Sequence, residues 1–500
     1  MTDDALAGAL ALVDRALEAY ASDPAAVATL RGYRARLQEP LRVALAGMVK
    51  AGKSTLLNAI IGEEIAPTDA GECTRVVTWY RYGHTPRVTL VPVAGEPRSL
   101  PVRRTDGRLA LELGGTPPEE VARLVVDWPA AGLRALTLID TPGIGSLSTE
   151  VSERSMRFLL PEDTPSEADA VVYLLRHLHA TDLQFLESFR DTAAGRSGTV
   201  NSLAVLSRAD EIGAGRIDAL VSARTVADRY RRDGGLRALA LAVVPVAGLL
   251  AQGARTLSQA EFAALSEVAG LDRDARERLL VSADRFVRAD PALRTTPQAR
   301  QSLLDRFGLF GIRLAAVLLR SGVTEPTPLA HELARRSGLD ALLRLLGDQF
   351  TARAAELKAR NAVLGVETLL RERPAPDSDA VAAVLERLTA RAHGLAELRL
   401  LAALRTGTVA LPRERAADAE RLLGGEGVSA GQRLALPEDA PADAVGPAAR
   451  EALQRWRRLA ESPLADRATV EVCRVVIRSC EALLAERSAP LTPGLVLTGD

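Results

Sequence analysis

Apolar residues along the chain follow three successive patterns. Residues 5–20 place apolar side chains three or four positions apart, and a similar stripe reaches Leu37, which predicts one or two amphipathic helices. From Leu41 to Val246, short β-rich runs are separated by glycine, proline and aspartate, and helical patterns alternate with several of them. This alternation is typical of an α/β unit in which helices cover a mostly parallel sheet.

The elements expected in this central region can be placed by residue number. The predicted strands cover residues 41–46, 75–82, 87–93, 133–139, 170–175, 203–206 and 241–246. The predicted helices include residues 54–61 and 182–190. The strand pattern ends near Gly248, and the periodicity after it is helical.

The clearest helical stripe in the second half begins at Ser337, which we interpret as an N-cap. Apolar residues then recur every seven positions at Leu343, Phe350, Leu357 and Leu364. This repeat predicts a helix that packs lengthwise against its partners.

Two later features complete the helical part. Residues 411–446 contain several glycines and prolines, and we interpret them as a connection between long helices that can be exposed. A final apolar stripe carries Cys473 and Cys480, which we interpret as core residues rather than as redox or metal groups.

Composition narrows the class of protein. Of the 500 residues 47% are hydrophobic, and the 63 basic and 64 acidic residues nearly cancel, so no polybasic arm predicts a nucleic-acid partner. Three cysteines are too few for a disulfide scaffold, and the longest apolar run, residues 238–251, is too short to span a membrane. The opening Met-Thr-Asp-Asp does not resemble a leader, so we expect a cytoplasmic protein.

A phosphate-binding motif follows the first predicted strand. Residues 47–54 read Gly-Met-Val-Lys-Ala-Gly-Lys-Ser and fit the pattern G-x-x-x-x-G-K-[ST] between a strand and a helix. Lys53 would neutralise the β- and γ-phosphates and Ser54 would bind Mg²⁺. Lysine here is notable because only three of the basic residues are lysine. The candidate phosphate-binding residues are Gly47, Val49, Lys50, Ala51, Gly52, Lys53, Ser54 and Thr55.

A second motif ends the strand predicted at residues 133–139. Asp140-Thr-Pro-Gly143 has the form D-x-x-G, in which the aspartate holds Mg²⁺ through water and the glycine N–H senses the γ-phosphate. Ile144 follows, where many small GTPases carry the glutamine that orients water, so hydrolysis must recruit another group. Arg75 and Lys50 are the candidates for supplying positive charge to the transition state.

The base-reading motif is degenerate. Ser207-Arg208-Ala209-Asp210 departs from [NT]-K-x-D at its first two positions, but Asp210 can still accept hydrogen bonds from N1–H and the N2 amine of guanine. Arg208 can lay its guanidinium plane on the base. Val246 and Ala247, at the end of the last strand, occupy the position of a backbone contact to the base.

One threonine should complete the magnesium shell. Both Thr68 and Thr74 lie between the two phosphate motifs, and we favour Thr74 because it directly precedes a predicted strand. The predicted metal ligands are therefore Ser54, Thr74 and Asp140.

Taken together, these motifs resemble the bacterial dynamin-like large GTPases. The similarity is specific over about residues 40–250, and it is greatest over residues 41–62, Leu-Arg-Val-Ala-Leu-Ala-Gly-Met-Val-Lys-Ala-Gly-Lys-Ser-Thr-Leu-Leu-Asn-Ala-Ile-Ile-Gly. It continues through Ile65-Ala-Pro-Thr-Asp and Thr74-Arg-Val-Val-Thr-Trp79 and is most similar to the shorter, IniC type of the isoniazid-inducible Ini group. The resemblance also points to Thr74 as the switch threonine.

The resemblance implies a P-loop GTPase domain with a mostly parallel, helix-covered sheet and an elongated, all-helical neck and trunk bundle. The implied division is N-terminal neck helices at 1–39, a dynamin-like GTPase domain at 40–335, a helical neck and trunk bundle at 336–490 with the connection at 411–446, and a tail at 491–500.

The same resemblance implies a function. Members of this group hydrolyse GTP to GDP and phosphate with Mg²⁺, which drives association through the GTPase heads and membrane tethering, fission or fusion. It implies a position at the inner face of the cell membrane, with lipid contact made directly or through a partner dynamin-like protein. The alternative is a soluble regulatory GTPase that acts on a ribosome, RNA or a protein partner.

A lipid-contacting segment is not evident in the sequence. Residues 307–312, Phe-Gly-Leu-Phe-Gly-Ile, could act as a lipid wedge, but leucines flank them on both sides. We therefore interpret this segment as a buried helix start. The connection at 411–446 is the second candidate for a lipid-contacting tip.

Overall fold

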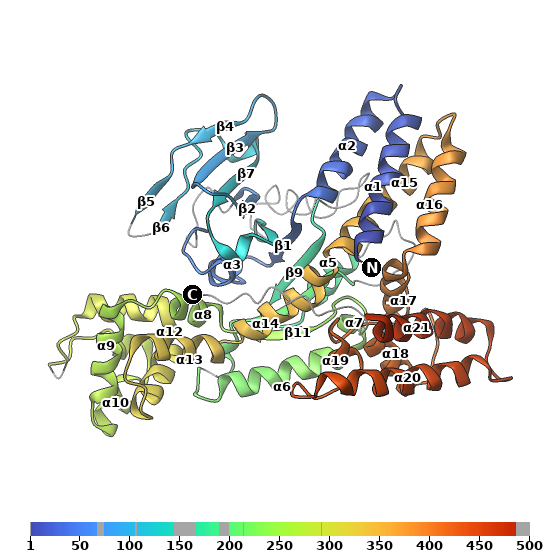
Figure 1. Cartoon of the computed structure of the whole chain (residues 1–500). Helices are drawn as coiled ribbons and strands as arrows, with labels where there is room; N and C mark the ends of the chain where they lie inside the picture. Colours follow the sequence, from blue (N-terminus) through green and yellow to red (C-terminus); the bar gives the residue numbers. More distant parts are fainter. Residues whose placement is uncertain are drawn as a thin grey trace.

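The computed structural model describes residues 2–67, 75–105, 108–144, 167–189, 200–213, 215–291 and 293–486 (Figure 1). The strands are β1 (Leu41–Gly47), β2 (Thr78–Tyr82), β3 (Arg87–Pro92), β4 (Arg98–Leu100), β5 (Arg103–Thr105), β6 (Arg108–Ala110), β7 (Val121–Trp128), β8 (Leu136–Asp140), β9 (Ala170–Leu175), β10 (Ser202–Ser207) and β11 (Val243–Val246).

Nine of these strands form one sheet in the order β11-β10-β9-β1-β8-β2-β7-β3-β4, and β5 pairs with β6. The strands from β11 to β8 are parallel, whereas β2 runs antiparallel to β8 and β3 runs antiparallel to both β7 and β4. The predicted mostly parallel sheet is confirmed, and all seven predicted strands are present. Sequence analysis missed the three-residue strands β4, β5 and β6 and also β7, which lacks a clear alternation because its last five residues are all buried.

Helices cover both faces of the sheet. α3 (Lys53–Ile61) shares one hydrophobic core with β1, β8 and β9, and α5 (Ala180–Phe189) and α6 (Ala219–Arg232) share the core on the other face. The parallel strands therefore end beside the turn that leads from β1 into α3, where a ligand of an open α/β sheet usually binds.

A helical lobe follows β11. Its helices are α8 (Gly248–Arg255), α9 (Gln259–Gly270), α10 (Arg273–Leu279), α11 (Ala283–Phe286), α12 (Pro297–Arg320) and α13 (Pro326–Arg336), whereas the short α7 (Gly234–Arg237) precedes β11 and packs on the sheet. Phe307, Phe310 and Ile312 are buried in the core of this lobe, which confirms the interpretation of residues 307–312 as a buried segment. α12 is kinked at Gly308, and its second half begins within this segment, so the expected helix start is present as well.

α14 (Leu339–Leu345) follows α13, and the remaining helices form two groups (Figure 1). They are α1 (Thr2–Ala19), α2 (Pro24–Gln38), α15 (Ala354–Glu372), α16 (Ser378–Arg391), α17 (His393–Arg405), α18 (Arg413–Leu422), α19 (Ala430–Arg433), α20 (Val445–Ala460) and α21 (Arg467–Glu486). α1, α2, α15 and α16 pack around one core and project from the sheet domain. α17 to α21 form the second group, in which the buried Cys473 and Cys480 confirm the core assignment.

Two details of the helical part differ from the prediction. Ser337 is not an N-cap, because α13 ends there and α14 begins after Gly338, whose φ is 86°. A side chain at 338 would collide with the carbonyl oxygen of Pro245, 2.2 Å from an added Cβ, so only glycine allows this turn. The predicted long helix is also interrupted by a π-helical turn at Leu346–Phe350, although Phe350, Leu357 and Leu364 are buried and Leu343 is half-buried.

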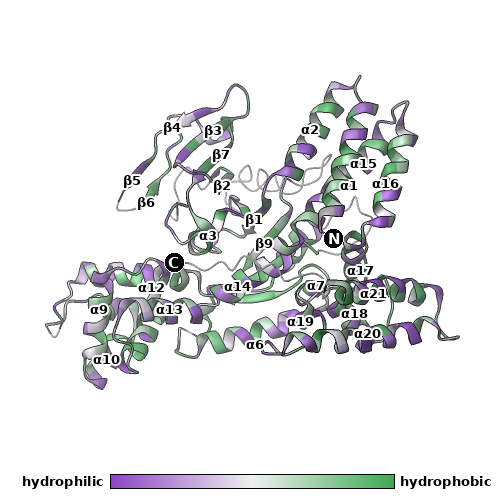
Figure 2. Cartoon of the chain, viewed as in Figure 1, coloured by the Kyte–Doolittle hydropathy of each residue, from purple (hydrophilic) through white to green (hydrophobic). Residues whose placement is uncertain are grey.

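The segment 411–446 connects α17 to α20, as expected, but it is itself partly folded. It contains α18 and α19, and its residues Ala419, Leu422 and Leu423 are fully buried. These apolar residues pack into the core that α17 and α21 share and form no exposed tip, whereas residues 437–439 and 441–443 are exposed. Within the described residues, no helix has the length and apolar character needed to cross a bilayer, and Figure 2 shows polar residues throughout the outer helices.

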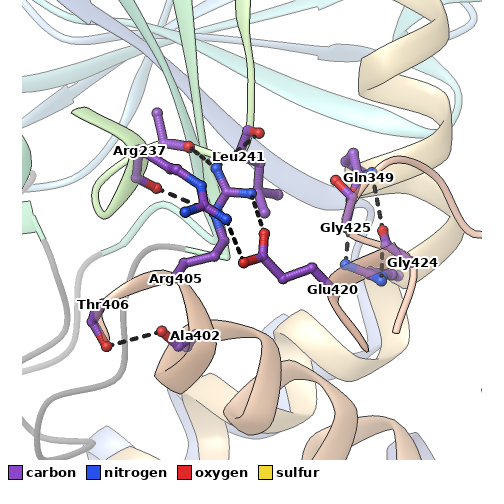
Figure 3. A network of polar contacts seen from close by, with 11 residues as sticks. Arg237, Leu241, Gln349, Ala402, Arg405, Thr406, Glu420, Gly424 and Gly425 are labelled. Atoms are coloured by element: carbon purple, nitrogen blue, oxygen red, sulfur yellow. Dashed lines mark hydrogen bonds and ion pairs between the residues drawn. The ribbon is translucent and has the colours of Figure 1, made fainter. Parts of the chain in front are cut away.

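Buried polar clusters join both helical groups to the sheet domain. Asp169, which precedes β9, accepts hydrogen bonds from Arg36 of α2 (2.9 Å) and Asn361 of α15 (2.8 Å). On the other side, Arg405 of α17 donates to the carbonyl oxygens of Ala240 (2.7 Å) and Leu241 (3.1 Å), and Glu420 of α18 pairs with Arg237 at 2.5 Å (Figure 3). The sheet domain thus contacts each group through fixed polar partners.

Candidate nucleotide-binding site

The loop from β1 to α3 has the backbone of a phosphate cradle. Gly47 has φ 147° and Gly52 has φ 92°, and Lys50 also lies in the left-handed region with φ 62°. A Cβ added to Gly47 would lie 2.4 Å from the carbonyl oxygen of Leu174 in β9, so a larger residue would push the loop away from the sheet. The glycines therefore let the loop curl over the N-terminus of α3, where backbone N–H groups attract phosphate.

Lys53 lies at the centre of this loop. Its side chain is buried, and Nζ donates to the carbonyl oxygens of Gly47 (3.1 Å) and Met48 (3.4 Å). Burial lowers the pKa of the Lys53 ammonium, and the Asp140 carboxylate opposes that shift. An anionic phosphate at the loop would supply the counter-charge that the buried ammonium lacks.

Ser54 and Asp140 meet at the end of β8. The Ser54 hydroxyl donates to Oδ2 of Asp140 at 2.7 Å, while the buried Oδ1 of Asp140 has no hydrogen-bond partner among the described residues. Burial raises the pKa of the Asp140 carboxyl, and Lys53 and the Ser54 hydroxyl act in the opposite direction. A hydroxyl beside a buried carboxylate with an unpaired oxygen fits a Mg²⁺ ion that is completed by phosphate and water.

The D-x-x-G segment is joined directly to the phosphate loop. Val49 N–H donates to the carbonyl of Ile144 (3.1 Å), and Ile144 N–H donates to the carbonyl of Gly47 (3.2 Å). A Cβ on Gly143 would lie 2.8 Å from Cα of Val49, so only glycine permits this approach. The structure therefore brings Gly143 against the loop that would hold the γ-phosphate.

A cavity of about 150 Å³ lies beside the phosphate loop. Its lining includes Thr55, Ser207, Asp210 and Val246. Arg208 has φ 50°, and its guanidinium donates to the carbonyl of Lys50 (3.0 Å) and pairs with Glu211 at 2.7 Å. Arg208 thus spans from the degenerate motif to the phosphate loop and forms one wall of the cavity.

Comparisons with known proteins agree with this geometry. The dynamin family model matches residues 43–111, which include β1, the phosphate loop and α3. The isoniazid-induced protein IniC of Mycobacterium tuberculosis is 45% identical over 455 residues, covering 91% of this chain and 92% of the relative. This chain belongs to the IniC type of dynamin-like proteins.

Two more distant matches extend the comparison of this IniC-type chain. A bacterial dynamin-like protein of Nostoc punctiforme is 26% identical over 179 residues, covering 33% of this chain and 24% of the relative. A solved structure described as an oligomerised bacterial dynamin pair for the long-range sensing and tethering of membranes aligns with 98% of this chain and 76% of its own, at 13% identity and a TM-score of 0.31. That TM-score is too low to establish a shared overall arrangement.

The structure places the remaining predicted site residues of the IniC-type chain differently with respect to the cavity. Thr68 and Thr74 lie outside the described residues. Arg75 is exposed just before β2. Ala247 is fully buried outside the cavity lining, and its N–H donates to the carbonyl of Ser337 at 2.8 Å, so that N–H does not face the cavity. Val246 does line the cavity, so the backbone contact predicted there stays with Val246 alone.

Sequence analysis missed several residues around the site. Leu249 and Glu211 line the cavity but belong to no named motif. Asn58 of α3 holds the chain after that helix, because its side chain donates to the carbonyl of Ala66 (2.9 Å) and accepts from the N–H groups of Ile65 (3.0 Å) and Ala66 (2.8 Å). An asparagine on the otherwise apolar helix 54–61 was the signal that could have identified this contact.

Proposed function

We propose that this IniC-type chain binds GTP with Mg²⁺ and hydrolyses it to GDP and phosphate. The arrangement of Lys53, Ser54 and Asp140 carries the proposal, since it combines a buried ammonium, a hydroxyl and a carboxylate oxygen without a partner at one loop. Bound Mg²⁺ would neutralise charge on the phosphates, and Ser54 and Asp140 would hold it, the latter through water. Lys53 would bind the β- and γ-phosphates, while Arg208 and Asp210 would bind the base.

The base specificity of this proposal rests on Asp210. Burial raises the pKa of its carboxyl, so a carboxylate here is favoured by hydrogen-bond donors that reach it. Guanine offers N1–H and an N2 amine to that carboxylate, whereas adenine offers neither. We therefore propose guanine rather than adenine as the base.

We also propose how the parts of the chain cooperate. The sheet domain with its helical lobe, residues 40–335, acts as the GTPase head, and residues 1–39 and 336–490 form the neck and trunk. Nucleotide binding would drive association through the heads. The polar contacts around Asp169 and Arg405 would transmit the conformational change of the head to the two helical groups. The proposed result is membrane tethering, fission or fusion, with lipid contact made directly or through a partner dynamin-like protein at the inner face of the cell membrane.

Steady-state GTP hydrolysis at several protein concentrations, with and without anionic liposomes, tests this function. We expect the specific rate to rise with protein concentration, because association through the heads would complete the site. Stimulation by liposomes as well would support direct membrane contact, and Leu464, 95% exposed at the turn between α20 and α21, is the first side chain to replace. A slow rate that depends on neither variable would favour a soluble regulatory GTPase.

The switch threonine provides a separate prediction. We expect Thr74→Ala to keep GDP binding and to lower the hydrolysis rate by about 10²-fold or more, because the hydroxyl would act only on Mg²⁺ and the γ-phosphate. Thr68→Ala is the matched control and should keep most of the rate. Single-turnover hydrolysis measures both variants, and loss of the rate in Thr68→Ala alone would move the switch assignment to that residue.

A further inference from the structure

Helix α12 is broken where it passes the base cavity. Gly308 has φ 62° and ψ 169°, a conformation that is essentially restricted to glycine. A Cβ added there would lie 3.7 Å from Oδ2 of Asp210 and 3.7 Å from Cδ2 of Leu249, and both of those residues line the cavity. The kink thus places the backbone of α12 directly behind the carboxylate that would read the base.

Arg306, two residues earlier, holds the kink from the other side. Its guanidinium forms ion pairs with Glu64, just beyond α3, and with Glu261 of α9. It also donates to the carbonyl oxygen (2.9 Å) and the hydroxyl (2.7 Å) of Thr256. The side chains of Arg306 and Glu64 are 16% and 10% exposed, so this ion pair is largely protected from solvent.

A second arginine fixes α12 beyond the kink. Arg313 donates to the carbonyl oxygens of Gly215 (2.6 Å) and Leu280 (2.6 Å). Gly215 lies in the loop that follows Asp210, and a Cβ added to it would be 3.6 Å from the Asp210 carbonyl oxygen. Helix α12 therefore supports Asp210 on both sides, although none of its residues belongs to a nucleotide motif.

We propose that Arg306 is a positioning residue for guanine recognition, which acts by holding the Gly308 kink against Asp210. This inference rests on the proposed function, because it concerns the same base cavity. Arg306 does not touch the nucleotide in this scheme. It fixes α12 to the end of α3 and to α9, so that the Asp210 carboxylate cannot turn away from the position that reads the N1–H and N2 amine of guanine.

Binding of GDP and IDP to the full-length chain with Mg²⁺ tests the proposal. IDP lacks the N2 amine, so the ratio of the two dissociation constants reports how well Asp210 reads that group. We expect Arg306→Gln to reduce the preference for GDP by about fivefold to tenfold, which is part of the factor of more than about tenfold that a whole hydrogen bond to a charged group contributes. Asp210→Asn is the positive control and should reduce the same ratio.

Arg320→Gln is the matched control. Arg320 belongs to the same helix, but its guanidinium donates to the carbonyl of Ala269 at 3.4 Å, away from the base cavity. The Arg320→Gln variant should keep the wild-type ratio of the GDP and IDP dissociation constants. Because Arg306→Gln leaves two carboxylates without their partner, Glu64→Gln serves as a second, milder variant and should lower the ratio in the same direction.

The outcomes separate this inference from the proposed function. If Arg306→Gln and Glu64→Gln lose affinity for GDP and IDP equally, the ratio of the two dissociation constants stays unchanged. That result would show that the contacts of Arg306 only stabilise the fold, and it would overturn the inference. A wild-type chain that binds neither nucleotide would instead overturn the proposed function.

Discussion

We expect Lys53→Ala to remove guanine-nucleotide binding almost completely while the chain stays folded. In the proposed complex, the Lys53 ammonium binds two phosphates, and charged hydrogen bonds of this kind contribute about 1.5–3 kcal/mol each. Their loss corresponds to a fall in affinity of about 10²-fold or more. Isothermal titration with GDP and with a non-hydrolysable GTP analogue, which carries both phosphates, measures the effect in the presence of Mg²⁺.

The fold should survive this substitution because the buried ammonium is costly without phosphate. Burial lowers the pKa of Lys53, which means that its charged form is disfavoured in the folded chain. Alanine removes that cost together with the two hydrogen bonds to Gly47 and Met48. The circular dichroism spectrum should therefore match that of the wild type, and a lost spectrum would mean that Lys53 is needed for folding.

Lys358→Ala is the matched control for the binding experiment. It removes the same side chain at a lysine that donates to the carbonyl oxygens of Leu37 (2.9 Å) and Glu39 (2.8 Å), away from the phosphate loop. The affinity of this variant for GDP should change less than about threefold, because the contacts of Lys358 lie far from the nucleotide-binding site. Similar affinity losses in both variants would contradict the specific role of Lys53.

The residues that sequence analysis placed correctly are those whose roles depend on local chain geometry. The phosphate loop, Asp140 and Gly143 each belong to a short segment at the end of a strand, and parallel strands bring such ends to one edge of a sheet. Their meeting could therefore be predicted before the contacts were known. The same reasoning placed Asp210 beside the loop, because β10 lies in the parallel part of the sheet.

The features that were missed depend on packing between distant segments. The Gly308 kink has no local signal beyond a glycine inside an apolar run, and its role becomes visible only where α12 passes Asp210. The folded part of segment 411–446 was missed for a related reason. Its glycines and prolines indicate breaks in a helix, but they do not show that Ala419 and Leu422 between them are buried against α17 and α21.

We expect Asp169→Ala to destabilise the chain strongly. Asp169 is 1% exposed and joins β9 to α2 and α15, where it binds Arg36, Asn361 and the backbone N–H of Arg42 (2.9 Å). Alanine would leave the buried Arg36 guanidinium without its carboxylate. Breaking a buried pair in this way costs about 3–5 kcal/mol, which corresponds to a fall of about 5–15 °C in the midpoint of the first thermal transition.

Asp14→Ala provides the comparison that isolates burial as the cause. Asp14 accepts from Arg34 at 2.7 Å, but its side chain is 49% exposed, and exposed pairs contribute about 0–1 kcal/mol. Its midpoint should stay within about 2 °C of the wild type. Equal shifts in the two variants would contradict the structure of this junction. A larger shift in Asp169→Ala would show that β9, which pairs with the strand that carries the phosphate loop, is anchored through α2 and α15.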